Sequence, residues 1–72
     1  MSNKFKIDPL QNQLEKMQAQ IEKREDFFEN RSEKWQESEK GEDYETRTQE
    51  LQQFADDLEN LIDSINEWNE EY

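Results

Sequence analysis

Apolar residues recur at alternating steps of three and four along most of this chain, a spacing that restricts it to helices packed along a seam. The first stripe runs through Leu10, Leu14, Met17 and Ile21 and continues at Phe28 and Trp35. Such spacing gathers apolar side chains on one face of a helix, where a second helix can cover them. The stripe therefore predicts an all-α fold.

A second apolar stripe follows the single glycine, Gly41. It comprises Tyr44, Leu51, Phe54, Leu58, Leu61, Ile65, Trp68 and Tyr72. Trp35 and Tyr44 lie nine residues apart, two more than a heptad. In one continuous helix those two residues would rotate the second stripe by about 200°. A reversal near Gly41 lets the stripes face each other, which predicts an antiparallel helical hairpin, a two-helix coiled coil.

Local signals mark the ends of the two predicted helices. Asp8 and Pro9 are residue types that favour a helix start. Gly41, preceded by Lys40 and followed by two acids, is typical of one helix ending and another beginning. The predicted organisation is a flexible arm at residues 1–7 and one hairpin domain at residues 8–72, with a helix over about 8–40, a turn at about 40–43 and a helix over about 43–71.

Three arginines, Arg24, Arg31 and Arg47, interrupt the predicted seam. Folding the chain about Gly41 places Arg24 near Leu58. An arginine there can lay its stem along the seam and reach neighbouring acids. Arg31 can instead stack on Trp35 one turn further on. These residues either set the register of the hairpin or bind a partner, and the sequence leaves open whether they are buried.

A two-helix hairpin leaves some apolar side chains uncovered. Phe27, Ala55 and Ile62 lie beside the strict seam and widen the stripe on one flank. Wide stripes are typical of helices in four-helix bundles. We therefore expect a homodimer of hairpins that forms a four-helix bundle, with Phe27, Ala55 and Ile62 at the dimer seam. The alternative is a monomer that leaves these groups exposed.

Nearly all of the net charge of −11 belongs to the second predicted helix. Residues 1–40 carry eight cations and nine acids, whereas residues 41–72 carry one cation and eleven acids. Acids keep a small bundle soluble, but solubility does not require this asymmetry. The expected partner-binding acidic face comprises Glu50, Asp56, Asp57, Glu59, Asp63, Glu67 and Glu70. Trp35, Tyr44 and Trp68 are candidate aromatic anchors, or they close the ends of the bundle.

The residue inventory argues against catalysis. The chain has no His and no Cys, which removes the usual general base and the imidazole and thiolate metal ligands. Adjacent carboxylates such as Asp56 and Asp57 point to different helix faces. No enzymatic activity, cofactor or metal site is therefore expected. Direct binding of nucleic acid is not expected, since acids repel phosphates, and no apolar run of about 18 residues offers a membrane span.

A basic protein surface is the partner that an acidic helix suits best, because opposite charges speed encounter. Nucleic-acid-binding proteins carry such surfaces, so the expected function is a protein-interaction module that binds and blocks one of them, as a DNA mimic does. The alternative function is a structural, self-associating coiled coil in which the acidity serves only solubility.

The stretch from Arg31 to Glu42 resembles runs found in short phage and bacterial reading frames. In size and acidity the chain is also similar to phage-encoded inhibitors of host defence, including anti-CRISPR proteins. This resemblance implies an inhibitor that acts in the cytoplasm of a bacterial host cell.

Overall fold

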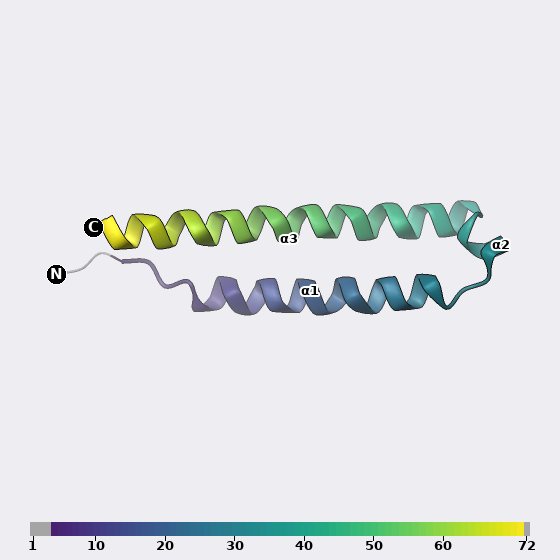
Figure 1. The fold of residues 1–72 in the computed structure, drawn as a ribbon, viewed down its shortest axis with the longest axis horizontal. Coiled ribbons are helices and arrows are strands. Elements are labelled where there is room, and N and C mark those ends of the chain that lie inside the picture. The colour runs from purple at the N-terminus through teal and green to yellow at the C-terminus, as the bar shows by residue number, and fades with distance from the viewer. Residues whose placement is uncertain (1–3, 72) are drawn as a thin grey trace.

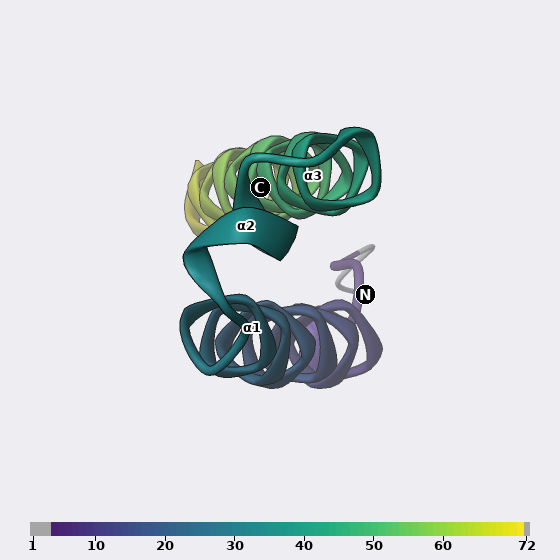
Figure 2. The same ribbon diagram turned by 90° about the vertical axis from the view of Figure 1, so that its right-hand side faces the viewer.

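Two long helices pack side by side in a computed structural model that describes residues 4–71. The helices in this part of the chain are α1 (Asp8–Glu29), α2 (Glu33–Gln36) and α3 (Glu39–Glu71). α1 and α3 run antiparallel, and the short α2 lies at the turn (Figure 1). Seen along its length, the molecule is one layer of two helices (Figure 2), and its extents are 59 × 15 × 11 Å. The all-α prediction is confirmed, with the long helices arranged as a hairpin.

The chain reverses earlier than predicted, because α1 ends at Glu29 and not near residue 40. The backbone N–H of Asn30 donates to the Asp26 carbonyl (3.1 Å) and closes the helix. Ser32 then caps α2 by accepting from the Trp35 N–H (3.2 Å), and Ser38 accepts from the Gly41 N–H (3.2 Å). Ser side chains favour such positions because their hydroxyl groups bond to nearby backbone groups in place of the helix ladder.

Gly41 lies inside α3, where it is buried, and no glycine has a positive φ. The predicted turn at residues 40–43 is therefore wrong. A Cβ built at Gly41 would lie 2.2 Å from the Trp35 carbonyl oxygen and 2.6 Å from that of Gln36. The glycine is needed because the first turn of α3 packs directly on the backbone of α2.

Replacing Gly41 with Ala is expected to destabilise the hairpin. At an open helical position the change stabilises by about 1 kcal/mol, through helix propensity. Here the added methyl meets backbone carbonyls that cannot rotate away, and such overpacking costs about 1–3 kcal/mol. Thermal unfolding followed by circular dichroism measures the sign. Lys40→Ala is the control, since Lys40 is exposed; a higher Tm for Gly41→Ala would contradict the close approach.

The seam between α1 and α3 is rotated from the predicted one. The buried residues of α3 recur every seven positions: Gly41, Thr48, Ala55 and Ile62. Beside them lie the half-buried Tyr44, Leu51, Leu58 and Ile65, and α1 contributes the half-buried Leu10, Leu14, Met17, Ile21, Arg24 and Phe28. The predicted seam residues Phe54, Leu61 and Trp68 are 57%, 51% and 40% exposed. Small side chains at the seam let the helices approach closely, and this displaces the larger ones to the flank.

The prediction that Ala55 and Ile62 lie at a dimer seam is wrong. They are 5% and 4% exposed within a single chain, because they face α1. Phe27, the third residue of that prediction, is exposed.

The N-terminal segment is tied to the far end of α3. The Phe5 N–H donates to the side-chain oxygen of Asn69 (3.0 Å), and the Asn69 amide donates back to the Phe5 carbonyl (2.9 Å). The Phe5 ring packs on Trp68, with centroids 5.3 Å apart. Residues 4–7 of the predicted flexible arm are therefore held in place. Residues 1–3 of that arm, and Tyr72 of the second stripe, lie outside the described residues.

Candidate interaction surfaces

All seven acids of the predicted partner-binding face are exposed on α3: Glu50, Asp56, Asp57, Glu59, Asp63, Glu67 and Glu70. Residues seven apart lie above one another on a helix. Two acidic rows result, one of Asp56, Asp63 and Glu70 and the other of Glu50 and Asp57. Between Glu42 and Glu71 the sequence contains a single cation, the exposed Arg47. α3 thus presents closely spaced carboxylates with little opposing charge on the same helix.

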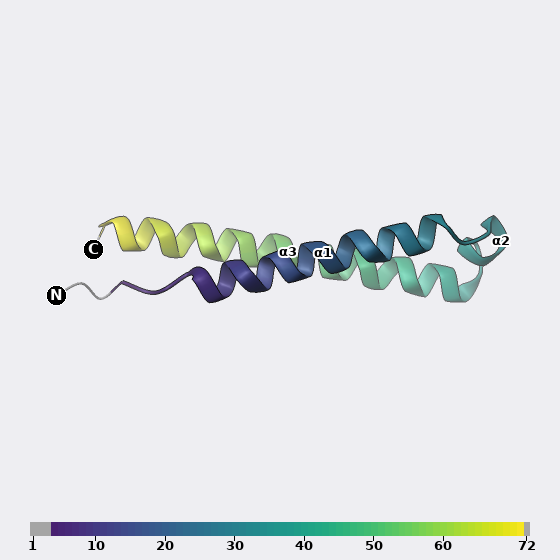
Figure 3. The same cartoon turned by 90° about the horizontal axis from the view of Figure 1, so that it is seen from below.

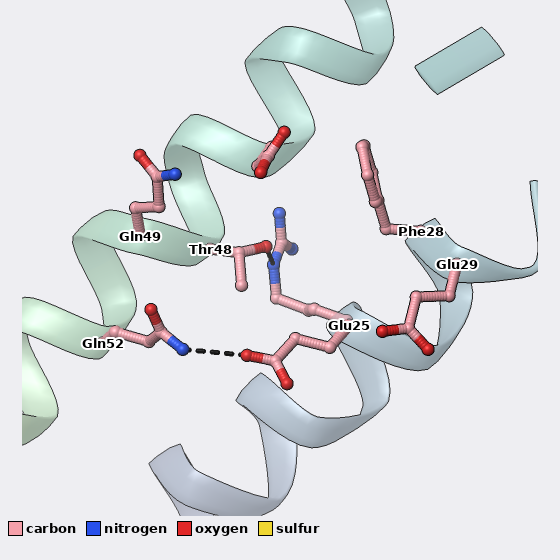
Figure 4. A pocket seen from close by; sticks show the side chains of 8 residues that line it. Glu25, Phe28, Glu29, Thr48, Gln49 and Gln52 are labelled. Carbon is pink, nitrogen blue, oxygen red and sulfur yellow. Dashed lines mark hydrogen bonds between the residues drawn. The ribbon is translucent and has the colours of Figure 1, made fainter. Parts of the chain in front are cut away.

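A polar groove of about 300 Å³ runs along one flank between α1 and α3 (Figure 4). Its lining includes three carboxylates, those of Glu25, Glu29 and Glu45. Gln52 bridges the helices there by donating to Glu25 (2.8 Å), as the dashed line between these two labelled residues shows in Figure 4. In residues 4–71 no three His, Cys, Asp or Glu side chains are grouped so as to hold a metal ion.

Arg24 is the polar centre of the seam. Its Nε donates to the Thr48 hydroxyl (2.9 Å), and its Nη2 donates to the Tyr44 carbonyl (3.0 Å). Its guanidinium also stacks 4.0 Å from the centre of the Tyr44 ring. The predicted position near Leu58 is wrong, because the earlier turn shifts the pairing of the helices. These contacts match the interpretation of Arg24 as a residue that sets the register.

An aromatic cluster closes the turn end of the hairpin. The Trp35 ring lies 5.9 Å from Phe27, 6.1 Å from Phe28 and 5.9 Å from Tyr44. Arg31 stacks on Trp35 at 4.7 Å, which confirms the stacking predicted for this pair. Trp35 and Tyr44 are half-buried in the cluster. Both therefore pack within the hairpin, as the end-closing alternative describes.

The most exposed large apolar side chains form what we call the apolar strip: Phe5, Trp68, Leu61, Phe54 and Phe27. Phe54, Leu61 and Trp68 are seven residues apart and form one row on a flank of α3. Phe5 extends the row beyond Trp68 through their ring contact. At the other end Phe27 contacts Tyr44, with ring centroids 5.1 Å apart.

Both helices contribute to the flank that carries the apolar strip. Gln20 of α1 lines a shallow groove together with Arg47, Leu51 and Phe54 of α3. Phe27 lies one heptad after Gln20 and shares its side of α1. The strip therefore runs along one side of the hairpin, opposite the flank of the polar groove. Sequence reasoning missed it because Phe54, Leu61 and Trp68 were assigned to the seam.

No family model, curated protein or solved structure matches this chain. In the part of the chain that the structure describes, no helix combines the length and apolar character needed to cross a membrane.

Proposed function

We propose that this protein is a non-enzymatic interaction module whose acidic α3 binds and blocks a basic surface of another protein. The observation that supports this is the exposure of all seven predicted acids on a helix with almost no opposing charge. α3 itself carries only one cation, Arg47, between Glu42 and Glu71, so its acids are not neutralised by cations of the same helix. A basic partner surface would supply that missing charge.

The charge density favours a nucleic-acid-binding protein as the partner. Eleven acids lie between Glu42 and Glu71, a span of about 45 Å at 1.5 Å per residue. This is one charge per about 4 Å, against about 1.7 Å in duplex DNA. Two hairpins together approach the duplex value, which is the basis for proposing a DNA mimic. Because the chain is similar in size and acidity to phage-encoded inhibitors, including anti-CRISPR proteins, we propose that the blocked partner is a defence protein in the cytoplasm of a bacterial host.

Reversing the charge of one acidic row is expected to abolish partner binding. The variant is Asp56→Lys, Asp63→Lys, Glu70→Lys, measured against the partner captured by the wild-type chain. We expect its Kd to rise about 100-fold or more, because like charges then face each other. Wild-type affinity should also fall steeply with added salt.

The matched control reverses three exposed acids of α1: Glu15→Lys, Glu22→Lys and Glu29→Lys. These acids are also seven residues apart, and the change in net charge is the same. Binding of this control within a few-fold of wild type supports a localised face on α3. Equal losses in the two variants, or no loss in the α3 variant, would overturn the proposal.

The second candidate function is structural self-association, in which the acidity serves only solubility. The apolar strip is the observation that favours it. Under this alternative, reversal of Asp56, Asp63 and Glu70 leaves the activity intact. Both functions are compatible with the further proposal that two hairpins pair into a four-helix bundle. Sedimentation equilibrium at tens of micromolar tests the pairing. A mass near 8.9 kDa, that of one chain, would contradict it.

A further inference from the structure

We propose that two copies associate through the apolar strip, with a two-fold axis parallel to the hairpin that sets α1 of each copy against α3 of the other. This inference rests on the proposed pairing of hairpins and specifies its surface and geometry. It does not depend on the binding of a basic partner. The occupant of the strip is thus a second copy of this chain.

The exposed surface of one hairpin exceeds that of a compact protein of the same mass, which leaves area for a second copy to cover. A compact monomer of 8.9 kDa exposes about 4,800 Å². The hairpin exposes 6099 Å², an excess of about 1,300 Å² over that relation. A standard interface removes about 800 Å² from each partner. A second copy seated on the strip would therefore remove more than half of this excess.

The side chains of the strip are the kind that a stable interface buries. Phe5 is 63% exposed and Phe27 is 46% exposed, and the row of Phe54, Leu61 and Trp68 lies between them. Aromatic residues dominate the binding energy of protein interfaces. Four of the five members of the strip are aromatic, and they extend along the length of the hairpin.

Opposite charges border the strip on its two sides. Lys16 and Lys23 lie four residues before Gln20 and Phe27 on α1, so they flank the strip on that side. Glu50 and Asp57 lie four residues before Phe54 and Leu61 on α3 and flank the other side. All four charged residues are exposed. The strip therefore has a basic edge on α1 and an acidic edge on α3.

The two charged edges are also level with each other along the hairpin. The hydrogen bonds from Arg24 to Thr48 and from Gln52 to Glu25 fix how the antiparallel helices align. In that alignment Lys23 is level with the turn of α3 that contains Glu50. Lys16, seven residues earlier, is level with the turn that contains Asp57, which lies seven residues later. The antiparallel crossing of α1 and α3 is seen from below in Figure 3.

This charge pattern selects one of two symmetric packings. Rotation about an axis parallel to the hairpin keeps the height of each residue and exchanges the edges. Lys23 then meets Glu50 of the second copy, and Lys16 meets its Asp57. Rotation about an axis that crosses the hairpin would set lysines against lysines and acids against acids, which is unfavourable. The parallel axis therefore fits the strip, and it places the two turns at the same end.

The test measures self-association of the full chain by sedimentation equilibrium. Leu61→Asp places a charge in the strip and is expected to raise the dimer Kd about 100-fold, as for an interface hot spot. The pair Lys16→Glu, Lys23→Glu is expected to raise it about 10-fold, through like-charge contacts across the edge. Adding Glu50→Lys and Asp57→Lys to that pair exchanges the edges and is expected to restore wild-type association.

The orientation is read from a nitroxide label on Lys34→Cys, an exposed position in α2. Labels in the two copies should be separated by less than half of the 59 Å length of the hairpin. A separation near the full length would overturn the inference. A dimer unaffected by Leu61→Asp and by the edge variants would also overturn it and would leave the pairing of hairpins intact. A monomeric wild type would overturn both.

Discussion

Replacing Ile62 with Asp is expected to unfold the hairpin, whereas replacing its neighbour Leu61 with Asp is expected to leave both helices formed. Ile62 is 4% exposed and faces α1, while Leu61 is 51% exposed on the flank. A carboxylate at position 62 would be buried without a partner, at a cost of several kcal/mol. That is comparable with the whole stability of a small domain, about 5 kcal/mol at the low end. At position 61 the carboxylate stays in water, and the cost is about 1 kcal/mol or less.

Far-ultraviolet circular dichroism of dilute protein separates the two substitutions. The Leu61→Asp chain should keep the helical signal of the wild type, and the Ile62→Asp chain should lose most of it at 25 °C. Dilution below the range of self-association ensures that the helical content of single hairpins is compared. The reverse result, with Leu61→Asp unfolded and Ile62→Asp folded, would restore the seam that the apolar pattern alone predicts.

This contrast shows what apolar spacing predicts about the seam and what it omits. The two stripes correctly predicted two amphipathic helices, and their relative rotation correctly predicted an antiparallel hairpin. A pattern of large apolar residues assigns Leu61 to the interface. It omits Gly41 and Thr48, which are not large apolar residues but lie in the buried row of α3. Helices approach most closely where side chains are small, so the structure turns α3 by one row toward those residues.

The position of the turn was predicted wrongly for a related reason. Trp35 continues the heptad pattern, and this favoured a helix that extends to residue 40. Asn30 follows the last residue of α1, and Ser32 and Ser38 accept hydrogen bonds at the starts of α2 and α3. These local signals compete with the apolar pattern, and α1 ends eleven residues before the predicted position. Asn30, Ser32 and Ser38 mark the turn, whereas Trp35 continues the apolar spacing through it. Gly41 wrongly indicated a chain reversal. Its lack of a side chain allows close packing of α3 on α2 instead.

The acidic face was predictable because exposed charges follow directly from helical periodicity. The link between Asn69 and Phe5 was not predictable, since it joins residues 64 positions apart and depends on how far the hairpin extends. The apolar strip lies between these cases. Its residues were identified as apolar, but their exposure depends on the rotation of the seam.

Replacing Arg24 with Ala is expected to lower the free energy of unfolding by about 2–4 kcal/mol. Hydrogen bonds to charged groups contribute about 1.5–3 kcal/mol, and Arg24 donates two of them across the seam, to Thr48 and to the Tyr44 carbonyl. Without Arg24, the buried Thr48 hydroxyl (Thr48 is 7% exposed) no longer accepts a hydrogen bond. It keeps only the bond that it donates to the Tyr44 carbonyl (3.0 Å). Arg31→Ala is the control, since Arg31 is exposed and stacks on rings, and it should cost about 1 kcal/mol or less. Urea unfolding measures both.

A second variant separates register from stability. Arg24→Met combined with Thr48→Val replaces the polar pair by apolar side chains of similar size, and such exchanges are often close to neutral in stability. The stability of this double variant is therefore expected to return toward that of the wild type. If the polar pair sets the register, its removal lets α1 slide against α3 between similar apolar pairings. An amide proton–nitrogen correlation spectrum should then show more than one backbone peak for residues of both helices. A single backbone peak for each residue in the double variant would mean that Arg24 contributes stability and that packing alone sets the register.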